Sequence, residues 1–271
     1  MLAILGAAVV AAVIAVELRP SEPFGHGRHD EQEWVQIFHD DFDGGELDRS
    51  VWNTCHWWDD GGCTISSNEE LEWYLPEQVS VSDGRLLLTA ARDRVETPED
   101  GTFEFRSGMV TTGPPQHDGT SRFDFTYGRV EARVKVPAGT GLWSAFWMLP
   151  SSEESRPEID ILESLGDEPS TWKFHFHPED RQRRSDGHDV DGPDLSAGFH
   201  DIGVDWEPER IRWFIDGEQV WEVEGDHVPD EPMYLVLNLA VGGVYPGPPA
   251  EDTPFPATYE IDRVTVWQRS T

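Results

Sequence analysis

Short segments in which apolar and polar residues alternate, or in which β-branched and aromatic residues gather, recur along the chain from Glu33 onward. A period of two is typical of strands with one buried face. Turn signals such as 82–84 (SDG) and 216–217 (DG) separate these segments. The expected strands are 85–90, 128–136, 142–149, 158–162, 211–215, 234–239 and 264–267. Many short strands without a helical period predict an all-β protein, built as a sandwich of two antiparallel sheets.

Two of these segments indicate what each strand face contacts. In 128–136 (GRVEARVKV), valine and alanine point one way and charged residues the other, which predicts one buried face and one face in water. In 142–149 (LWSAFWML), both faces are largely apolar, and Trp143 and Trp147 share one of them. One face must meet the core. The face with the tryptophans either lines a cleft or is buried as well.

The N-terminus differs from the rest of the chain. Residues 1–16 form an unbroken apolar or small run, which is short for a membrane span and suits a signal peptide, although no Lys or Arg precedes it. A cleaved signal peptide and an uncleaved anchor both stay open, and either leaves the remainder outside the cytoplasm. Residues 17–32 are polar and rich in Pro, Gly and His, which indicates a linker. Residues 33–271 show no second break in composition and are expected to form one domain.

Cys55 and Cys63 are the two cysteines of the chain. In an oxidising compartment they could close one small loop as a disulfide. The alternative is a pair of metal ligands, but the sequence offers no third or fourth soft ligand nearby. A disulfide agrees with a secreted or extracellular protein.

The charge balance is extreme, with 53 acidic and 20 basic residues and a formal net charge of −33. This balance excludes a nucleic-acid binder, which would carry basic patches, and disfavours an anionic substrate, which the field would repel. Lys135 and Lys173 are the only lysines. A Lys-poor, acidic surface keeps a protein hydrated in salt, so we hypothesise a halophilic or salt-tolerant source. A genomic bias towards Arg and acidic residues is the alternative.

Three acids, Glu158, Asp160 and Glu163, lie in a segment that otherwise resembles a core strand (EIDILE). Acidic residues are depleted in strand interiors. Glu158 and Asp160 must share a face, whereas strict alternation would direct Glu163 into the hydrophobic layer, where an unpaired carboxylate is costly. One extra residue, a β-bulge at Ile161–Leu162, would bring all three acids to one face. The spacing therefore predicts a bulge there.

Three acids on one strand face have three readings. They could form a solvated face, bind a cation such as calcium through oxygen ligands, or catalyse glycoside hydrolysis with retention. Retaining hydrolysis needs two carboxyl groups about 5–5.5 Å apart: one attacks the anomeric carbon, and the other protonates the leaving oxygen and then activates water. An Asp between them could share a proton and keep the pair in opposite ionisation states. The nearby Trp143 and Trp147 favour catalysis, because flat rings cover the apolar faces of sugars.

At this point the sequence resembles glycoside hydrolase family 16 and, within it, the laminarinase-like endo-β-1,3-glucanases. The family pattern E-x-D-x-x-E is matched by Glu158, Asp160 and Glu163. Further stretches similar to the family are 68–92, 105–110, 128–150, 233–243 and 261–268. The similarity covers about residue 34 to the end, with its motifs in the right order. It implies a β-jelly-roll sandwich of the concanavalin A type with a substrate cleft on its concave face.

The resemblance also implies a role for each acid. Glu158 would be the nucleophile, Glu163 the acid/base and Asp160 their helper, while Trp143 and Trp147 match tryptophans near the cleavage point. No cofactor is required for this chemistry.

Further positions match residues that hydrogen-bond sugar in the family: Asn68, Arg106 and His177. His175 is the alternative to His177, because the segment around them (WKFHFHPED) diverges from the family's usual wording.

A structural calcium often lies on the convex side of the family's fold. Asp41 and Asp262 match the side chains expected there, with a backbone carbonyl near Gly84, and a plain pair of surface acids is the alternative.

The expected activity is retaining endo-hydrolysis of β-1,3 bonds in neutral β-glucans such as laminarin, by a secreted monomer. Mixed-linkage β-1,3-1,4-glucan is the nearest alternative substrate, followed by galactans such as agar and by carrageenans, and the net charge opposes the sulfated ones. A carbohydrate-binding sandwich without catalysis is the alternative from another class.

Overall fold

The computed structural model describes residues 34–56, 63–97, 101–152 and 154–270. The expected signal peptide or anchor (1–16) and linker (17–32) lie outside the described residues. The strands are β1 (Trp34–Asp40), β2 (Glu72–Tyr74), β3 (Val79–Val81), β4 (Leu86–Ala90), β5 (Val95–Thr97), β6 (Gly101–Phe103), β7 (Phe105–Ser107), β8 (Met109–Thr111), β9 (Gly128–Lys135), β10 (Leu142–Pro150), β11 (Glu158–Leu165), β12 (Thr171–His177), β13 (Asp186–Asp191), β14 (His200–Glu207), β15 (Arg210–Ile215), β16 (Glu218–Glu224), β17 (Met233–Val241) and β18 (Ala257–Arg269). Two 3-10 helices, η1 (Ser66–Asn68) and η2 (Pro76–Gln78), are each three residues long.

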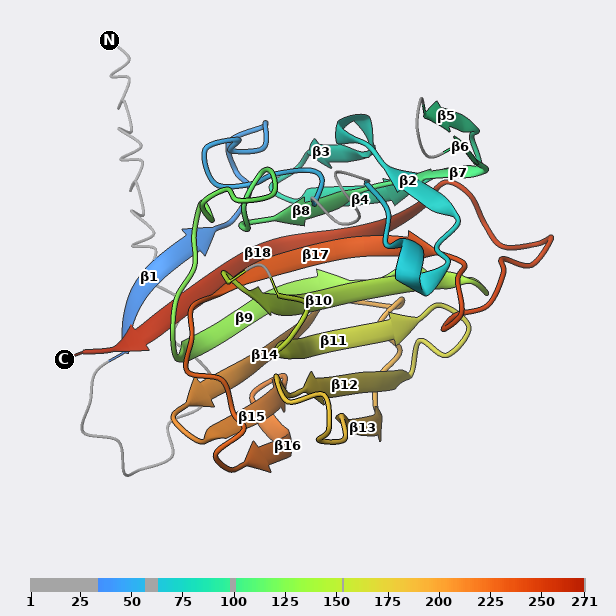
Figure 1. The fold of residues 1–271 in the computed structure, drawn as a ribbon. Helices are drawn as coiled ribbons and strands as arrows, with labels where there is room; N and C mark the ends of the chain where they lie inside the picture. Colours follow the sequence, from blue (N-terminus) through green and yellow to red (C-terminus); the bar gives the residue numbers. More distant parts are fainter. Residues whose placement is uncertain (1–33, 57–62, 98–100, 153, 271) are drawn as a thin grey trace, which may run out of the picture.

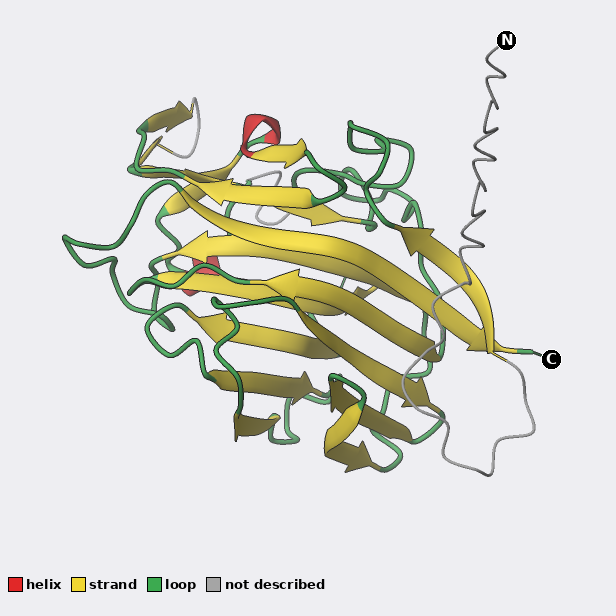
Figure 2. Cartoon of the chain, turned by 180° about the vertical axis from the view of Figure 1, so that it is seen from behind, coloured by secondary structure: helices red, strands yellow, loops and turns green. Residues whose placement is uncertain are grey.

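Two large sheets make up the fold (Figure 1). One has eight strands in the order β16-β15-β14-β9-β18-β4-β3, with β1 also paired to β18. The other has six strands in the order β13-β12-β11-β10-β17-β8. Seen from behind, the described chain is strand and loop apart from its short helical turns (Figure 2). The predicted all-β sandwich is confirmed.

The core lies between the two sheets and is made by the inward rows of both. Val130, Ala132 and Val134 of β9 and Phe146 and Met148 of β10 are fully buried in one hydrophobic cluster. The alternation predicted for both segments is therefore confirmed for the core-facing rows. The outer row of β10, which carries the two tryptophans, faces away from this cluster and contributes to a second, smaller one.

The charged row of β9 corrects one prediction. We expected this face to be in water, but Arg129 and Glu131 are 8% and 5% exposed. Arg129 donates to Asp205 on β14 at 2.7 Å, and Glu131 accepts from Arg263 on β18 at 3.1 Å. Long arginine side chains from neighbouring strands cover the face and neutralise its acids, so buried charge here is paired charge.

Within the described residues, no helix combines the length and the apolar composition that crossing a bilayer requires. The location of the protein stays a prediction.

Candidate active site

The three acids share one strand, β11, and a bulge lies between two of them. Against β10, Asp160 pairs with Trp147 and Glu163 pairs with Ala145, so β11 has one residue more than β10 between these positions. The register against β12 shifts over the same interval. The bulge predicted from the spacing is confirmed, and it places Glu163 on the same face as Glu158 and Asp160.

The bulged residues themselves point inward. Ile161 and Leu162 are both fully buried in the main hydrophobic cluster. Two consecutive residues on the core side are what a bulge allows and a regular strand does not. Burial of this pair therefore fixes the acids on the opposite, outer face of the six-stranded sheet.

The acids form a close and largely buried cluster. Side-chain oxygens of Glu158 and Asp160 lie within 4.8 Å of each other, and so do those of Asp160 and Glu163. Asp160 and Glu163 are only 4% and 7% exposed, while Glu158 is half-buried. This burial contradicts the reading of the acids as a solvated strand face.

Two histidines of β12 contact these acids. His175 Nδ1 contacts Glu163 Oε2, and His177 Nε2 lies 3.3 Å from Asp160 Oδ2 and 4.0 Å from Glu158 Oε1. The sequence left His175 and His177 as alternatives. The structure brings both to the acids, because they are two residues apart on one strand and share a face.

Burial and mutual repulsion alter the acidity of the cluster. Burial, followed by the neighbouring charge of Asp160, raises the pKa of Glu158 well above its usual value. Burial, followed by the charge of Glu163, does the same to the pKa of Asp160. Burial works against a charged His175, but the contact with Glu163 outweighs it and raises the pKa of that imidazole. The cluster therefore holds a proton at a pH where isolated carboxylic acids would be ionised.

Aromatic side chains flank the acids along the outer face. Trp147 donates from its Nε1 to Asn238 Oδ1 at 2.8 Å, next to the Asp160 register position. Trp143 is half-buried and meets Tyr245 edge-on at 5.2 Å. Tyr245 is 42% exposed and was not predicted from the sequence, although an aromatic residue within a Gly- and Pro-rich turn (VGGVYPGPP) is a signal that could have indicated it. Rings beside Asp160 and beyond Glu163 could hold sugar units.

Comparisons with known proteins agree with this arrangement. The sequence model of the Glycosyl hydrolases family 16 matches residues 67–264. The chain belongs to this family. It is 32% identical over 248 residues to the endo-1,3-1,4-beta-glycanase EglC of Rhizobium meliloti (strain 1021), covering 86% of this chain and 51% of that protein. It is 32% identical over 264 residues to the glucan endo-1,3-beta-glucosidase A1 of Niallia circulans, covering 86% of this chain and 37% of that protein. The chain thus spans about half, or less, of these two relatives.

Solved structures give the same picture of the fold. The endo-beta-1,3-glucanase of Pyrococcus furiosus superposes with a TM-score of 0.80 at 34% identity, and the match covers 89% of this chain and 97% of that one. The described sandwich is therefore the jelly roll of family 16.

A chain of hydrogen bonds links Asn68, an expected sugar-binding residue of this family 16 chain, to Trp147. Asn68 donates to Glu70 Oε1 at 3.0 Å, and Tyr74 donates to Glu70 Oε2 at 3.1 Å. Asn238 donates to the Tyr74 hydroxyl at 3.0 Å and accepts from Trp147. Glu70, Tyr74 and Asn238 were not found from the sequence, because their contacts join distant segments.

Arg106 lies elsewhere in the family 16 fold. It belongs to β7 in the small sheet with β2, and its guanidinium is 3.2 Å from the carboxylate of Asp93. The structure therefore does not bring Arg106 to the three acids, and its sugar-binding role stays a prediction.

One of the expected calcium ligands, Asp262, lies beside two arginines of the protein. The Asp262 carboxylate lies 3.4 Å from Arg263 and 3.8 Å from Arg133. Gly84 turns with φ +68° between β3 and β4, and Asp41 is exposed after β1. Two guanidinium groups beside Asp262 do not fit a calcium site, because they already neutralise the negative charge that would bind the metal. The calcium stays a prediction.

The acids themselves could also be read as a metal site. Glu158 and Asp160 with His177, and Asp160 and Glu163 with His175, each bring three ligand atoms within 4.8 Å of one another. Calcium takes six to eight oxygen ligands. Two carboxylates and an imidazole do not provide that shell, so the geometry favours the carboxylates as reacting groups.

Cys55 and Cys63 are joined as a disulfide, with their Cα atoms 5.3 Å apart. The Cys63 carbonyl accepts from the backbone of Tyr74 at 2.7 Å. The bridge therefore ties Cys55 to the segment around Tyr74.

Proposed function

We propose that this chain is an endo-acting, retaining β-1,3-glucanase that cleaves neutral β-glucans by double displacement. The observation that carries this proposal is the bulge of β11, which gathers Glu158, Asp160 and Glu163 on one outer sheet face beside Trp147. Family membership supports the reaction type. The names of the relatives from Rhizobium meliloti, Niallia circulans and Pyrococcus furiosus support β-1,3 bonds, alone or mixed with β-1,4 bonds.

In the first step, a Glu158 oxygen forms a bond to the anomeric carbon while the glycosidic C–O bond breaks. The leaving oxygen takes the proton of Glu163, and a covalent glycosyl ester remains on Glu158. In the second step, Glu163 removes a proton from water, whose oxygen attacks the same carbon and releases Glu158. Two inversions give net retention.

Asp160 keeps the two glutamates in different ionisation states. Burial and the charge of Glu163 raise the pKa of Asp160. A proton on Asp160 would leave Glu158 free to react as a carboxylate. His175 acts as a positioning residue, because its contact with Glu163 orients that carboxyl group.

The aromatic side chains supply the binding surface for the sugar chain. Trp147 lies at the acids, with its indole held by Asn238, and Trp143 and Tyr245 extend the surface beyond Glu163. We infer that these rings line the substrate cleft on the outer face of the six-stranded sheet. A held ring loses little freedom on binding, which favours affinity.

The alternatives differ in substrate or in chemistry. A mixed-linkage β-1,3-1,4-glucan is the nearest other substrate, and the net charge of −33 opposes sulfated galactans. A carbohydrate-binding protein without catalysis would have no use for a buried, proton-holding acid cluster. We also infer that the protein acts outside the cytoplasm, supported by the disulfide between Cys55 and Cys63.

The test is the release of reducing ends from laminarin by the wild type and by Glu158→Gln. We expect rapid release by the wild type and a loss of at least about a thousandfold in the variant, since the covalent step is removed. Equal rates for the two proteins would overturn the assignment of Glu158. Release from mixed-linkage glucan alone would favour the alternative substrate, and binding without release would favour the non-catalytic reading.

A further inference from the structure

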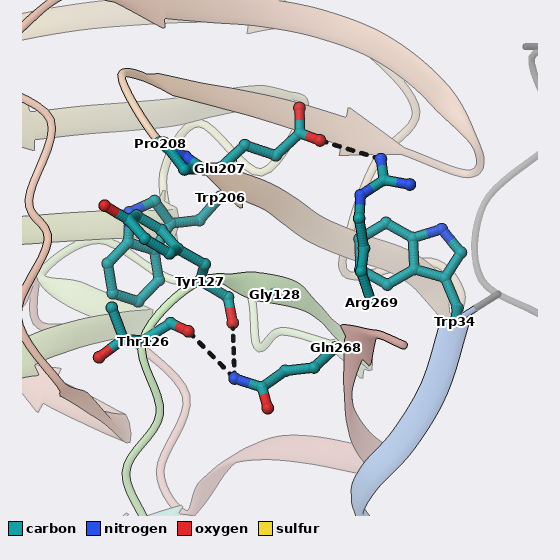
Figure 3. Close-up of a pocket in the computed structure, with 9 residues that line it drawn as sticks. All are labelled: Trp34, Thr126, Tyr127, Gly128, Trp206, Glu207, Pro208, Gln268 and Arg269. Carbon is teal, nitrogen blue, oxygen red and sulfur yellow. Dashed lines mark hydrogen bonds and ion pairs between the residues drawn. The ribbon is translucent and has the colours of Figure 1, made fainter. Parts of the chain in front are cut away.

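Two glutamates next to the proposed cleft are buried without a basic partner. Elsewhere in the fold such acids are paired with arginines: Glu131 is 3.1 Å from a guanidinium group, and Figure 3 shows Glu207 joined to Arg269 at 2.9 Å. Glu70 and Glu72 are 6% and 0% exposed, and neither has an ion pair within the residues that the structure describes. Two buried carboxylates without a cation cannot both be charged at a modest cost.

The carboxyl group of Glu70 is surrounded by donors. The backbone N–H of Ile65 donates to Oε2 at 3.3 Å, and the Tyr74 hydroxyl donates to the same oxygen at 3.1 Å. The Asn68 amide donates to Oε1 at 3.0 Å. Burial raises the pKa of Glu70, but these hydrogen bonds act against that rise. Donors on both oxygens favour the ionised form, so Glu70 is the charged member of the two.

The surroundings of Glu72 favour a neutral acid instead. The backbone N–H of Val241 on β17 donates to Oε2 at 2.8 Å, whereas Oε1 is buried without a hydrogen-bond donor. An ionised oxygen in that place would be costly. A proton on Glu72 removes the cost, because a carboxylic acid can donate to the Glu70 carboxylate. Burial, followed by the charge of Glu70, raises the pKa of Glu72 well above its usual value.

Asn68 connects this pair to the cleft. Its amide nitrogen donates to Glu70, and Oδ1 and the second N–H have no other partner among the described residues. The backbone carbonyl of Asn68 accepts from Val244 at 2.8 Å, one residue before Tyr245. Tyr245 in turn meets Trp143 edge-on at 5.2 Å. The half-buried Asn68 therefore lies next to the turn that carries the aromatic end of the proposed cleft.

We propose that Glu70 and Glu72 form a proton-sharing pair that positions Asn68 to bind sugar. Glu72 is a neutral carboxylic acid that donates a hydrogen bond to the Glu70 carboxylate, and Glu70 fixes the plane of the Asn68 amide. Sugar as the ligand of Asn68 rests on the proposed function. An amide that is already held loses little freedom on binding, which favours affinity. Both acids are positioning residues, because their burial keeps them from touching the substrate.

The first test compares KM and kcat for laminarihexaose, a β-1,3-linked glucose oligomer, between the wild type and Glu70→Gln. The new NH₂ group turns a donor toward the donors of Asn68 or of Ile65 and Tyr74. We expect KM to rise by about tenfold, which corresponds to one lost hydrogen bond to sugar. The value of kcat should change by less than about twofold, because Asn68 does not contact the reacting atoms. Glu77→Gln, which replaces an exposed acid on η2, is the matched control and should equal the wild type.

Two substitutions and a spectrum test the neutral state of Glu72. Glu72→Gln keeps an acceptor for Val241 and a donor for Glu70, so this conservative variant should keep KM within about twofold of the wild type. Glu72→Met removes both groups and should raise KM as Glu70→Gln does. In the infrared spectrum at neutral pH, the carbonyl band of neutral carboxylic acids should lose one component in Glu72→Gln and none in Glu77→Gln.

Each outcome supports or overturns the proposal. A wild-type KM in Glu70→Gln, with reducing-end release intact, overturns the positioning role and leaves the proposed hydrolysis standing. A lower unfolding temperature without a change in KM means that the pair only supports the fold, which also overturns the role. An unchanged carbonyl band in Glu72→Gln overturns the neutral acid. Glu72→Met gives a second measure of KM if Glu70→Gln does not fold.

A failure of the proposed hydrolysis is recognised separately. If the wild type releases no reducing ends, the binding of laminarihexaose to the wild type and to Glu70→Gln is measured by calorimetry. Binding that is about tenfold weaker in Glu70→Gln would support the pair although the hydrolysis had failed. Equal binding to the two proteins, or no binding to either, would overturn the positioning role as well.

Discussion

Trp213 donates a hydrogen bond from its indole Nε1 to the backbone carbonyl oxygen of Asp160 at 2.9 Å. Trp213 is fully buried on β15 of the eight-stranded sheet, whereas Asp160 lies on β11 of the other sheet. The bond therefore crosses the core and reaches the backbone where the bulge begins. It satisfies a carbonyl group that the irregular ladder would otherwise leave exposed to an apolar environment.

Replacing Trp213 with Phe should affect both stability and catalysis. We expect a loss of about 1–3 kcal/mol of unfolding free energy, because a buried carbonyl loses its donor. We also expect kcat to fall, since the bulge sets the spacing of the acids. The measurements are urea unfolding and laminarin hydrolysis. Trp206→Phe is the control, because Trp206 is equally buried and donates to the Pro229 carbonyl at 3.0 Å, away from the acids. A similar loss of kcat in both variants would count against a role of Trp213 at the bulge.

Glu158→Gln should be more stable than the wild type at neutral pH. The folded-state pKa of Glu158 is raised by burial and by Asp160, so the folded protein binds a proton more tightly than the unfolded chain. Stability is therefore lost as the pH rises from the ordinary value of 4.5 through the raised pKa, by about 1.4 kcal/mol for each pH unit of the shift. A glutamine carries no charge and escapes this penalty.

Thermal unfolding at pH 4 and pH 7.5 checks this expectation. The variant should match the wild type at the lower pH and unfold at a higher temperature at the higher pH. Glu224→Gln, on the exposed end of β16, is the control and should change little at either pH. A variant that is less stable at pH 7.5 would mean that Glu158 contributes to stability as a carboxylate.

His175→Gln should lose stability mainly in acid. The contact with Glu163 raises the folded-state pKa of His175 above its ordinary value of 6.5. The contribution of this contact to the free energy of unfolding is therefore fully present below pH 6.5, and it is lost as the pH rises through the raised pKa. The variant should thus have a lower unfolding temperature at pH 6 and approach the wild type at pH 9. We also expect kcat to drop by roughly a hundredfold, because a misplaced Glu163 donates its proton poorly.

The control for this prediction is His200→Gln, which removes an imidazole that lies 2.8 Å from Asp216 on the other sheet. Its kcat should equal that of the wild type. An unchanged kcat in His175→Gln would show that Glu163 does not need this neighbour for orientation.

Molar salt should preserve or raise both stability and activity. At a net charge of −33, repulsion between acids opposes the compact state, and raising salt from 0.1 M to 1 M shortens the screening length from about 10 Å to about 3 Å. Buried ion pairs of β9, such as Arg129–Asp205, are screened less. Unfolding temperature and laminarin hydrolysis in sodium chloride are the measurements. Full activity at low salt that collapses in molar salt would contradict the halophilic hypothesis.

The sequence by itself determined the fold class and the acid cluster. Alternation along β9 and β10 identified the core rows, because a strand with one buried face repeats every two residues. The bulge was also predictable, because an unpaired Glu163 carboxylate in the core would be costly. Ile161 and Leu162 are the residues that are buried there instead. These are local constraints, and each is written within a few consecutive residues.

The tertiary structure decided which distant residues meet. Asn238 donates to Tyr74 across 164 positions in the chain, and Trp147 donates to Asn238 across 91. It also covered the charged face of β9, which alternation alone predicted to be in water. Pairing between strands is set by loop closure and by packing over the whole core. Such contacts leave no period in the sequence, so only the folded chain reveals them.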